Sequence, residues 1–187
     1  VSTAPGNAPT ELFELVITES FYATEAEDPG DPAWTLGVPG DGASTGHWLR
    51  AEPVGTTYNG VVVQTDYDHT TDPGVACYVT ANGPVGGAAG DYDVDDGCTT
   101  LLSPVFNLST AERAFVSYWR WFGQTGFATD DDWVVEVTNN GGASWVELER
   151  ISNNHNAWNQ VALELGSLGG GFELTDQVQL RFLACDL

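Results

Sequence analysis

Lysine and methionine are absent from this 187-residue sequence, and its five basic residues are all arginine. Aspartate and glutamate number 27, which gives a formal net charge of -22 at pH 7. Such a surface repels nucleic acids and anionic membranes, so both are excluded as partners. Because charges at this density also repel one another, we expect bound calcium or a salty medium to neutralise part of them.

Sequence motifs of hydrolytic enzymes are also missing. There is no Gly-x-Ser-x-Gly, no His-Glu-x-x-His and no cysteine beside a histidine. His47, His69 and His155 lie in different segments, where we expect packing or turn hydrogen bonds. Paired carboxylates can hydrolyse glycosidic bonds, but among 27 acidic residues their proximity in sequence has little meaning. The sequence favours a protein that is not an enzyme and has no catalytic residues.

No apolar run is long enough to span a membrane, and no lipidation motif is present. The sequence starts at Val1, followed by small and polar residues, as an end left by removal of a secretory signal would. We therefore expect a secreted protein, extracellular or on the cell surface, without membrane insertion.

Cysteine occurs only three times. In an exported protein, a disulfide between Cys77 and Cys98 would close a loop of about 20 residues and stabilise the fold by roughly 3 kcal/mol. It would also hold the acidic loop that precedes Cys98. Cys185 would then be unpaired, and we expect it to be buried in the last strand as a small apolar side chain.

No segment has apolar residues recurring every three or four positions, as the buried face of a helix would. Glycine and proline are frequent, with 22 and 9 residues. The 42% of hydrophobic residues separates the chain from a disordered acidic polymer. Residues 114–122 carry large apolar groups on both faces, which predicts a central strand covered on both sides. Repeated short segments of period two predict an all-β fold, an antiparallel two-sheet β-sandwich.

Two later strands have one apolar face each, and residues 138–145 between strands have the spacing Thr-x-Asn-x-Gly-x-Ser-Trp. This turn resembles an Asp-box, with Asn140 in the aspartate position, and we expect it to serve folding. The apolar faces comprise Trp133, Val135 and Val137 in one strand and Val178, Leu180, Phe182 and Ala184 in the last.

The length of the chain is that of one domain. Residues 1–10 are small, polar and interrupted by proline, so we expect a flexible N-terminal tail or linker. Residues 11–187 would form a single sandwich domain. Residues 11–18 have the β-branched and aromatic content of a strand.

Residues 91–97 place carboxylates at alternate positions before a glycine, which suits a loop that binds a hard cation. The loop is not an EF-hand, because its sixth position is Asp96 and its twelfth is Leu102. A second acidic cluster surrounds Asp68, and the two loops could share one ion. The predicted cofactor is Ca²⁺, and the alternative is a solvated acidic turn. The predicted ligands are Asp66, Asp68, Asp91, Asp93 and Asp95.

Seven tryptophans and six tyrosines could also provide a flat surface for sugar rings. Most of them fall in strongly apolar strands and should be core residues. The candidates for a carbohydrate-binding site are those under fewer constraints, namely Trp34, Trp48, Tyr92 and Trp158.

Several segments carry a resemblance by their order along the chain, which runs from near Phe21 to the end of the sequence. They are residues 34–48, 52–56, 68–70, 77–80, 93–104, 117–121, 140–145 and 181–186. Together they resemble a bacterial extracellular module of the MAM-like, concanavalin-like jelly-roll type, found beside secreted peptidases and other exported enzymes. The resemblance implies a non-catalytic jelly-roll sandwich with structural calcium.

Modules of this type continue past the position of Asp186 into an apolar closing strand, whereas this sequence ends at Leu187. The resemblance therefore implies an incomplete sandwich or a longer chain. Residues 11–18 could close the sandwich within the same subunit, or act as a donor strand for a neighbouring one and build filaments head to tail. We expect an extracellular structural or adhesive subunit that binds copies of itself. The alternative is a carbohydrate-binding or accessory module of a secreted hydrolase that binds extracellular polysaccharide.

Overall fold

A computed structural model describes residues 22–28, 34–124, 131–153 and 155–187. Within these ranges the chain forms eleven β-strands and one three-residue 3-10 turn, η1 (Leu165–Ser167). None of the described residues belongs to a helix of the length and hydrophobicity that crossing a membrane requires. The all-β prediction is confirmed. The expected tail at residues 1–10 and strand at residues 11–18 lie outside the described residues.

Five antiparallel strands form the larger sheet. The central strand, β11, pairs with one neighbour over six residue pairs and with the other over eight. The order across the sheet is β1 (Thr35–Leu36), β6 (Gly97–Leu102), β11 (Gln179–Asp186), β8 (Asp131–Thr138) and β9 (Val146–Ile151).

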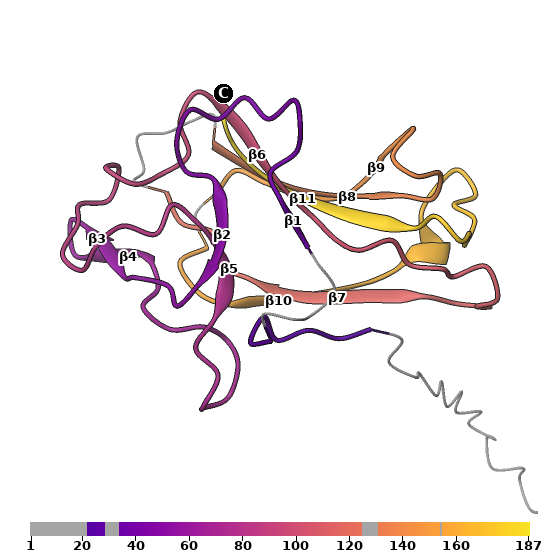
Figure 1. Ribbon diagram of the computed structural model, residues 1–187, viewed down its shortest axis with the longest axis horizontal. Helices are drawn as coiled ribbons and strands as arrows, with labels where there is room; N and C mark the ends of the chain where they lie inside the picture. Colours follow the sequence, from indigo (N-terminus) through magenta and orange to yellow (C-terminus); the bar gives the residue numbers. More distant parts are fainter. Residues whose placement is uncertain (1–21, 29–33, 125–130, 154) are drawn as a thin grey trace, which may run out of the picture.

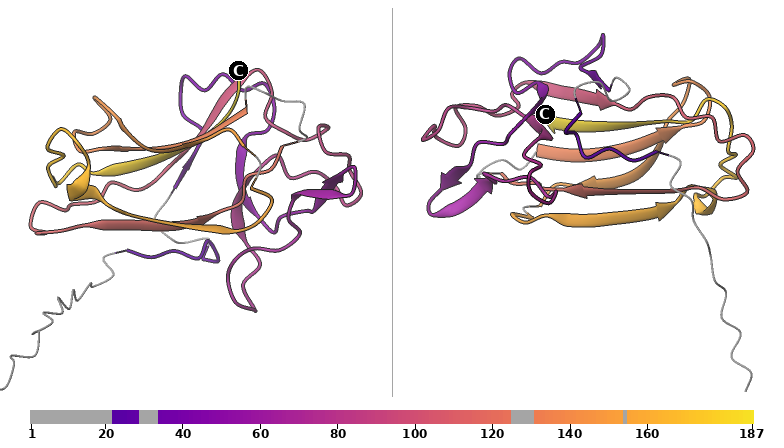
Figure 2. Two further views of the ribbon diagram at one scale, coloured as in Figure 1. Left: turned by 180° about the vertical axis from the view of Figure 1, so that it is seen from behind. Right: turned by 60° about the horizontal axis from the view of Figure 1, so that its bottom comes forward.

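A second layer lies against this sheet (Figure 1). It is formed by β7 (Phe115–Arg120) and β10 (Asn159–Glu164), which pair antiparallel over six residue pairs. The two layers make an antiparallel β-sandwich, as Figure 2 also shows from behind. The jelly-roll strand order stays a prediction.

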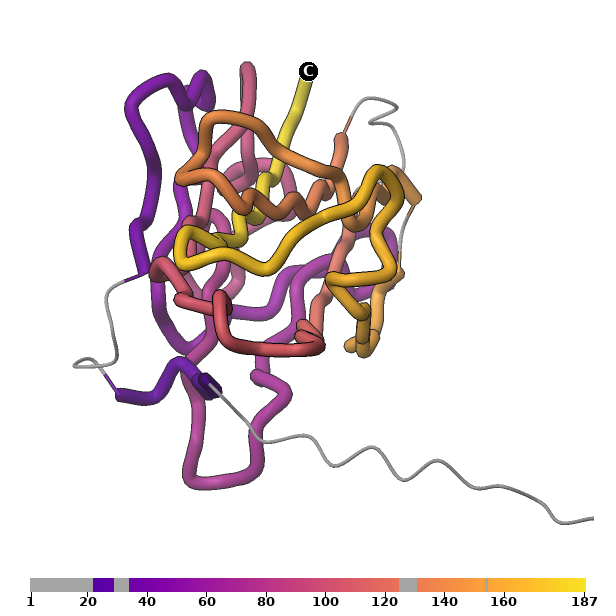
Figure 3. Tube along the Cα trace, turned by 90° about the vertical axis from the view of Figure 1, so that its right-hand side faces the viewer, coloured from indigo at the N-terminus to yellow at the C-terminus, as the bar shows by residue number. Residues whose placement is uncertain are grey.

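Two further antiparallel pairs lie near one end of the sandwich (Figure 1). β2 (Trp48–Ala51) pairs with β5 (Cys77–Thr80), and β3 (Thr56–Tyr58) pairs with β4 (Val61–Gln64). Figure 3 faces the opposite end, where the turn after β8 lies beside the segment before β11. There the Asn139 side-chain amide donates a hydrogen bond to the backbone oxygen of Glu173 at 3.0 Å.

The apolar faces predicted for two strands form the core between the layers. Val135 and Val137 of β8 are 0% exposed, and Phe182 of β11 packs its ring against Trp133 at 5.9 Å. The predicted faces are confirmed, except that Ala184 is only half-buried. The buried cluster comprises Trp48, Leu101, Trp133, Val135, Val137, Leu165, Val178, Leu180 and Phe182.

The Asp-box prediction for residues 138–145 is also confirmed. Asn140 accepts hydrogen bonds from the Thr138 hydroxyl at 2.8 Å and from the Ser144 backbone at 3.0 Å. Gly142 has a φ of +87°, and its Cα faces the Trp145 ring so closely that an added Cβ would lie 3.5 Å from it. The turn is held by side chains of its own sequence.

The predicted disulfide between Cys77 and Cys98 is wrong. Cys98 of β6 bonds to Cys185 of β11, with 4.0 Å between their Cα atoms. These two residues are direct cross-strand partners, which places both sulfurs on the same face of the sheet. Cys77 lies on β5 in a different sheet and is a half-buried free thiol. Burial, with the charges of Asp68 and Glu27 nearby, raises the pKa of Cys77 to about 12.

Candidate functional site

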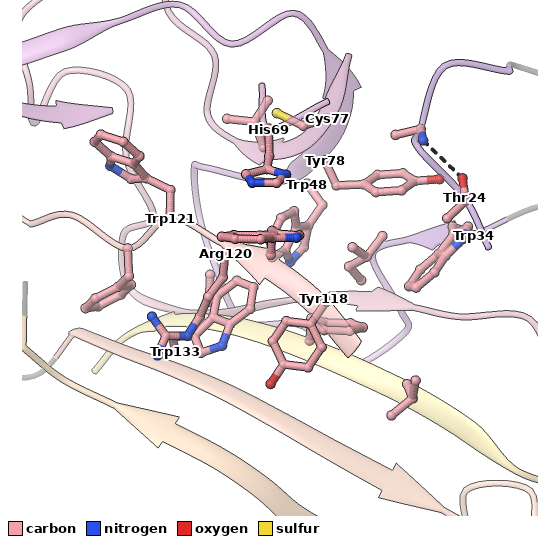
Figure 4. A pocket seen from close by; sticks show the side chains of 18 of the residues that line it. Thr24, Trp34, Trp48, His69, Cys77, Tyr78, Tyr118, Arg120, Trp121 and Trp133 are labelled. Carbon is pink, nitrogen blue, oxygen red and sulfur yellow. Dashed lines mark hydrogen bonds between the residues drawn. The ribbon is translucent and has the colours of Figure 1, made fainter. Parts of the chain in front are cut away.

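A cavity of about 1890 Å³ lies between β7 and β5 and reaches the core. Leu101 of β6 and Leu180 of β11 contribute to its lining, as do residues 22–26. Figure 4 shows Cys77 and Tyr78 on one side and Tyr118 of β7 on the other. Most of the lining residues are apolar or aromatic, and charged side chains are among them as well.

The two strands that flank the cavity each have one partner among the described residues. β7 pairs with β10, and β5 pairs with β2. In an antiparallel ladder, every second residue directs its N–H and C=O groups away from the partner. The other edge of β7 thus presents a row of backbone donors and acceptors that no described strand engages, which is a template for an additional strand.

The sequence predicted that residues 114–122 form a central strand covered on both faces, and the structure differs. Val116 and Tyr118 pack against the core, but Phe115 and Trp119 on the outer face are 49% and 42% exposed. Large apolar residues occupy both faces because β7 borders the cavity as well as the core. The residue pattern of β7 is typical of an inner strand, although the described part of the chain contains only one strand that pairs with it, β10.

A buried polar network ties β7 to the larger sheet. Glu149 of β9 forms an ion pair with Arg120 at 2.7 Å, and both side chains are mostly buried. The Tyr118 hydroxyl donates to Glu149 at 2.8 Å, and the Trp133 indole N–H donates to it at 3.1 Å. Burial opposes ionisation of Glu149, but the hydrogen bonds from Arg120 and Tyr118 outweigh it and lower the pKa of Glu149. Burial and the bond to Glu149 raise the pKa of Tyr118. The carboxylate is held charged between the layers.

Three of the predicted calcium ligands belong to one acidic loop. Partial desolvation and the charge of Asp95 raise the pKa of Asp93, and Asp186 and Asp91 raise it further. The loop is held by Thr45, whose hydroxyl donates to the Asp95 carboxylate at 2.7 Å and to the backbone oxygen of Asp93 at 2.9 Å. These carboxylates are close enough to repel one another.

The other two predicted ligands are arranged differently. Asp68 is 8% exposed and accepts hydrogen bonds from the backbone N–H and the hydroxyl of Thr70. Asp66 is exposed and lies close to Gly55. A Cβ added to Gly55 would be only 2.9 Å from the Cβ of Asp66. Across the described ranges, no group of three or more histidine, cysteine, aspartate or glutamate side chains is placed to hold a metal ion. Calcium binding stays a prediction.

The four predicted carbohydrate-binding residues all contribute to the lining of the cavity, but they differ in exposure. Trp48 is 7% exposed and its indole N–H donates to the Thr99 backbone oxygen, so it is a core residue. Trp34 packs against Tyr78 at 5.4 Å in the same region. Tyr92 is exposed beside the glycine-rich loop, and Trp158 is half-buried. Carbohydrate binding at these residues stays a prediction.

An aromatic cluster lies at the end of β7, and of its members only Trp158 was among the predicted site residues. His69 stacks on Trp119 with ring centroids 3.6 Å apart and planes 16° apart. Tyr67, which is 58% exposed, meets Trp121 edge-on at 6.4 Å, and Trp121 meets Trp158 at 6.1 Å. The signal in the sequence was the alternation of residues 115–120, which puts Trp119 on the face opposite Tyr118.

No family model, curated protein or solved structure matches this chain. The resemblance to MAM-like, concanavalin-like modules therefore stays a prediction.

Proposed function

We propose that this protein is a non-catalytic extracellular structural or adhesive subunit whose sandwich receives an additional β-strand in the cavity beside β7. One observation carries the proposal: two strand edges flank an apolar cavity that reaches the core. An extended chain placed there gains backbone hydrogen bonds from the edges and buries alternate side chains between the layers.

Export agrees with the chemistry of the chain. The Cys98–Cys185 disulfide is of the kind that persists in oxidising compartments. A net charge of -22 keeps such a subunit in solution and attracts cations to its acidic loop. We include calcium as the predicted cation, since residues 91–96 provide oxygen ligands that Ca²⁺ prefers. A jelly-roll module attached to a secreted enzyme would use the same cavity and the same acidic loop.

Strand addition is tested with the full chain at low protein concentration and an eight-residue peptide of alternating valine and threonine. Occupation of the cavity raises the melting temperature by roughly 5–10 °C at about 100 times the dissociation constant. The matched control is the same peptide with two central prolines, which cannot complete a β-ladder. Equal melting temperatures with both peptides and with none would contradict the proposal.

A second candidate function is carbohydrate binding at the aromatic cluster around Trp119. Trp119 is 42% exposed, and the His69 ring stacks on it and fixes its orientation. Tyr67 of the same cluster is exposed. Such rings stack on sugars. Glycan-array binding that is lost in Trp119→Ala and kept in Phe115→Ala would support this function, because both residues lie on the outer face of β7. Absence of binding by the unchanged protein would reject it.

A further inference from the structure

The cavity beside β7 sets a pattern for any strand that enters it. Val116 and Tyr118 direct their side chains toward the core, whereas Phe115, Ser117 and Trp119 are exposed on the outer face. A neighbouring strand follows the same alternation, since adjacent strands share one pleat. The entering strand therefore needs large apolar side chains at alternate positions and tolerates a charge at the positions between.

Residues 11–18, Glu-Leu-Phe-Glu-Leu-Val-Ile-Thr, have this pattern. Three large apolar residues, Phe13, Leu15 and Ile17, fall on one face, which starts with Glu11. The other face is mixed and consists of Leu12, Glu14, Val16 and Thr18. Eight extended residues span about 26 Å, which exceeds the roughly 20 Å of the six residues of β7. We infer that residues 11–18 of a neighbouring copy of this chain are the strand that enters the cavity, an inference that rests on the proposed function.

The choice of a neighbouring copy follows from where the chain enters the described fold. Tyr22 accepts a hydrogen bond from the Trp34 indole N–H at 2.9 Å and contacts the Phe106 ring at 5.2 Å. Residues 22–26 themselves line the cavity, so a strand of the same chain that entered it would have to fold back onto the segment that follows it. The sequence between the two, residues 19–21, is Glu-Ser-Phe, without the glycine, asparagine, aspartate or proline that tight hairpins favour.

Insertion into a neighbour joins different surfaces of the two copies, the donor segment of one and the cavity of the other. Such a contact is head-to-tail, and it propagates unless the rotation closes a ring. The expected product is a filament, or a closed ring of subunits.

Two substitutions at adjacent donor positions test the alternation by electron microscopy and sedimentation. Leu15→Asp places a charge on the inward face, and we expect assembly to require at least a tenfold higher protein concentration. Val16→Asp places the same charge on the outward face, and we expect assembly within a factor of three of the unchanged protein. Equal behaviour of the two variants, or no assembly by the unchanged protein, would overturn the inference.

Cross-linking of mixed proteins separates a neighbour from the same chain. One protein carries Val16→Cys, the other carries Ser117→Cys, and both carry Cys77→Ser to remove the free thiol. A disulfide-linked heterodimer after mixing and oxidation supports insertion between copies. A chain with all three substitutions that forms the link only within monomers overturns it.

Peptides distinguish failure of this inference from failure of the proposed function. The Leu15→Asp protein is heated with a peptide of residues 11–18 and with the alternating valine-threonine peptide. We expect the first peptide to raise the melting temperature by roughly 5–10 °C at about 100 times its dissociation constant. A shift with only the valine-threonine peptide retains strand addition and overturns the role of residues 11–18. No shift with either peptide overturns both.

Discussion

The two layers of this sandwich differ in how many neighbours their strands have. In the larger sheet, β6, β11 and β8 each lie between two partners, and the Cys98–Cys185 disulfide joins two of them. In the other layer and at its end, β7 and β5 each have one described partner and border the cavity. The comparison predicts that stability is concentrated in the larger sheet, and under our proposal the other layer receives the additional strand.

The largest effect should come from the disulfide of the rigid sheet. Its cysteines are 87 residues apart, so the chain-entropy model predicts a loss of about 4–5 kcal/mol for the double variant Cys98→Ala with Cys185→Ala. Urea unfolding measures the loss. Cys77→Ala on β5 is the control, with an expected change below about 1 kcal/mol. A loss with Cys77→Ala as large as with the double variant would contradict the described pairing.

The next prediction compares the loss of stability when one phenylalanine is removed from each layer. Phe182→Ala in β11 removes a 6% exposed ring that contacts Trp133 and Tyr118, and should cost about 4 kcal/mol. Phe115→Ala in β7 removes a 49% exposed ring and should cost about 0.5 kcal/mol. Both values come from denaturant unfolding of the dilute protein. Equal losses would show that β7 is as firmly packed as β11.

The network that joins the layers should give a smaller loss with a defined pH dependence. Glu149→Gln leaves Arg120 buried without its charged partner and should cost about 3 kcal/mol. Because folding lowers the pKa of Glu149, its contribution is present above the unfolded value near 4.3 and is lost as pH falls through the folded pKa. The difference between unchanged protein and variant should therefore shrink below about pH 4.

Glu164→Gln is the control for that experiment. Glu164 pairs with Arg113 at 2.7 Å in solvent, and we expect little change in stability at any pH. A loss at neutral pH that persists undiminished at pH 3 in Glu149→Gln would contradict the role of a charged Glu149.

The smallest effect concerns the acidic loop, and its sign is opposite. Folding raises the pKa of Asp93, so its charge disfavours the folded state at neutral pH and its protonation, as pH falls, restores stability. Asp93→Asn with a chelator should raise the melting temperature by about 1–2 °C at pH 7. If the loop binds calcium as predicted, added Ca²⁺ stabilises the unchanged protein more than the variant. A lower melting temperature of the variant with chelator would contradict the repulsion.

The sequence predicted the larger sheet better than the layer of β7 and β10, for a physical reason. Alternation in β8 and β11 and the side-chain bonds of Asn140 are local, and each was confirmed. The disulfide was wrong because it depends on which strands pair. Cys98 lies opposite Cys185 only through the β6–β11 register, which short-range spacing does not reveal.

The exposure of the individual tryptophans was predicted least well. Trp119 and Trp48 are similar in sequence terms, yet one is exposed on β7 and the other is buried beneath β6. Their difference arises from the neighbours of their strands rather than from their own segments. The strand-like pattern of residues 11–18 was visible in the sequence, whereas the cavity that we propose it enters became visible only in the fold.

Backbone hydrogen exchange of the full chain across a range of protein concentrations tests the central claim most directly, with β8 as an internal reference. If a strand from another copy enters the cavity, protection of β7 amides rises with concentration, whereas β8 amides stay equally protected throughout. Protection of β7 that does not change from the most dilute to the most concentrated sample would contradict the account.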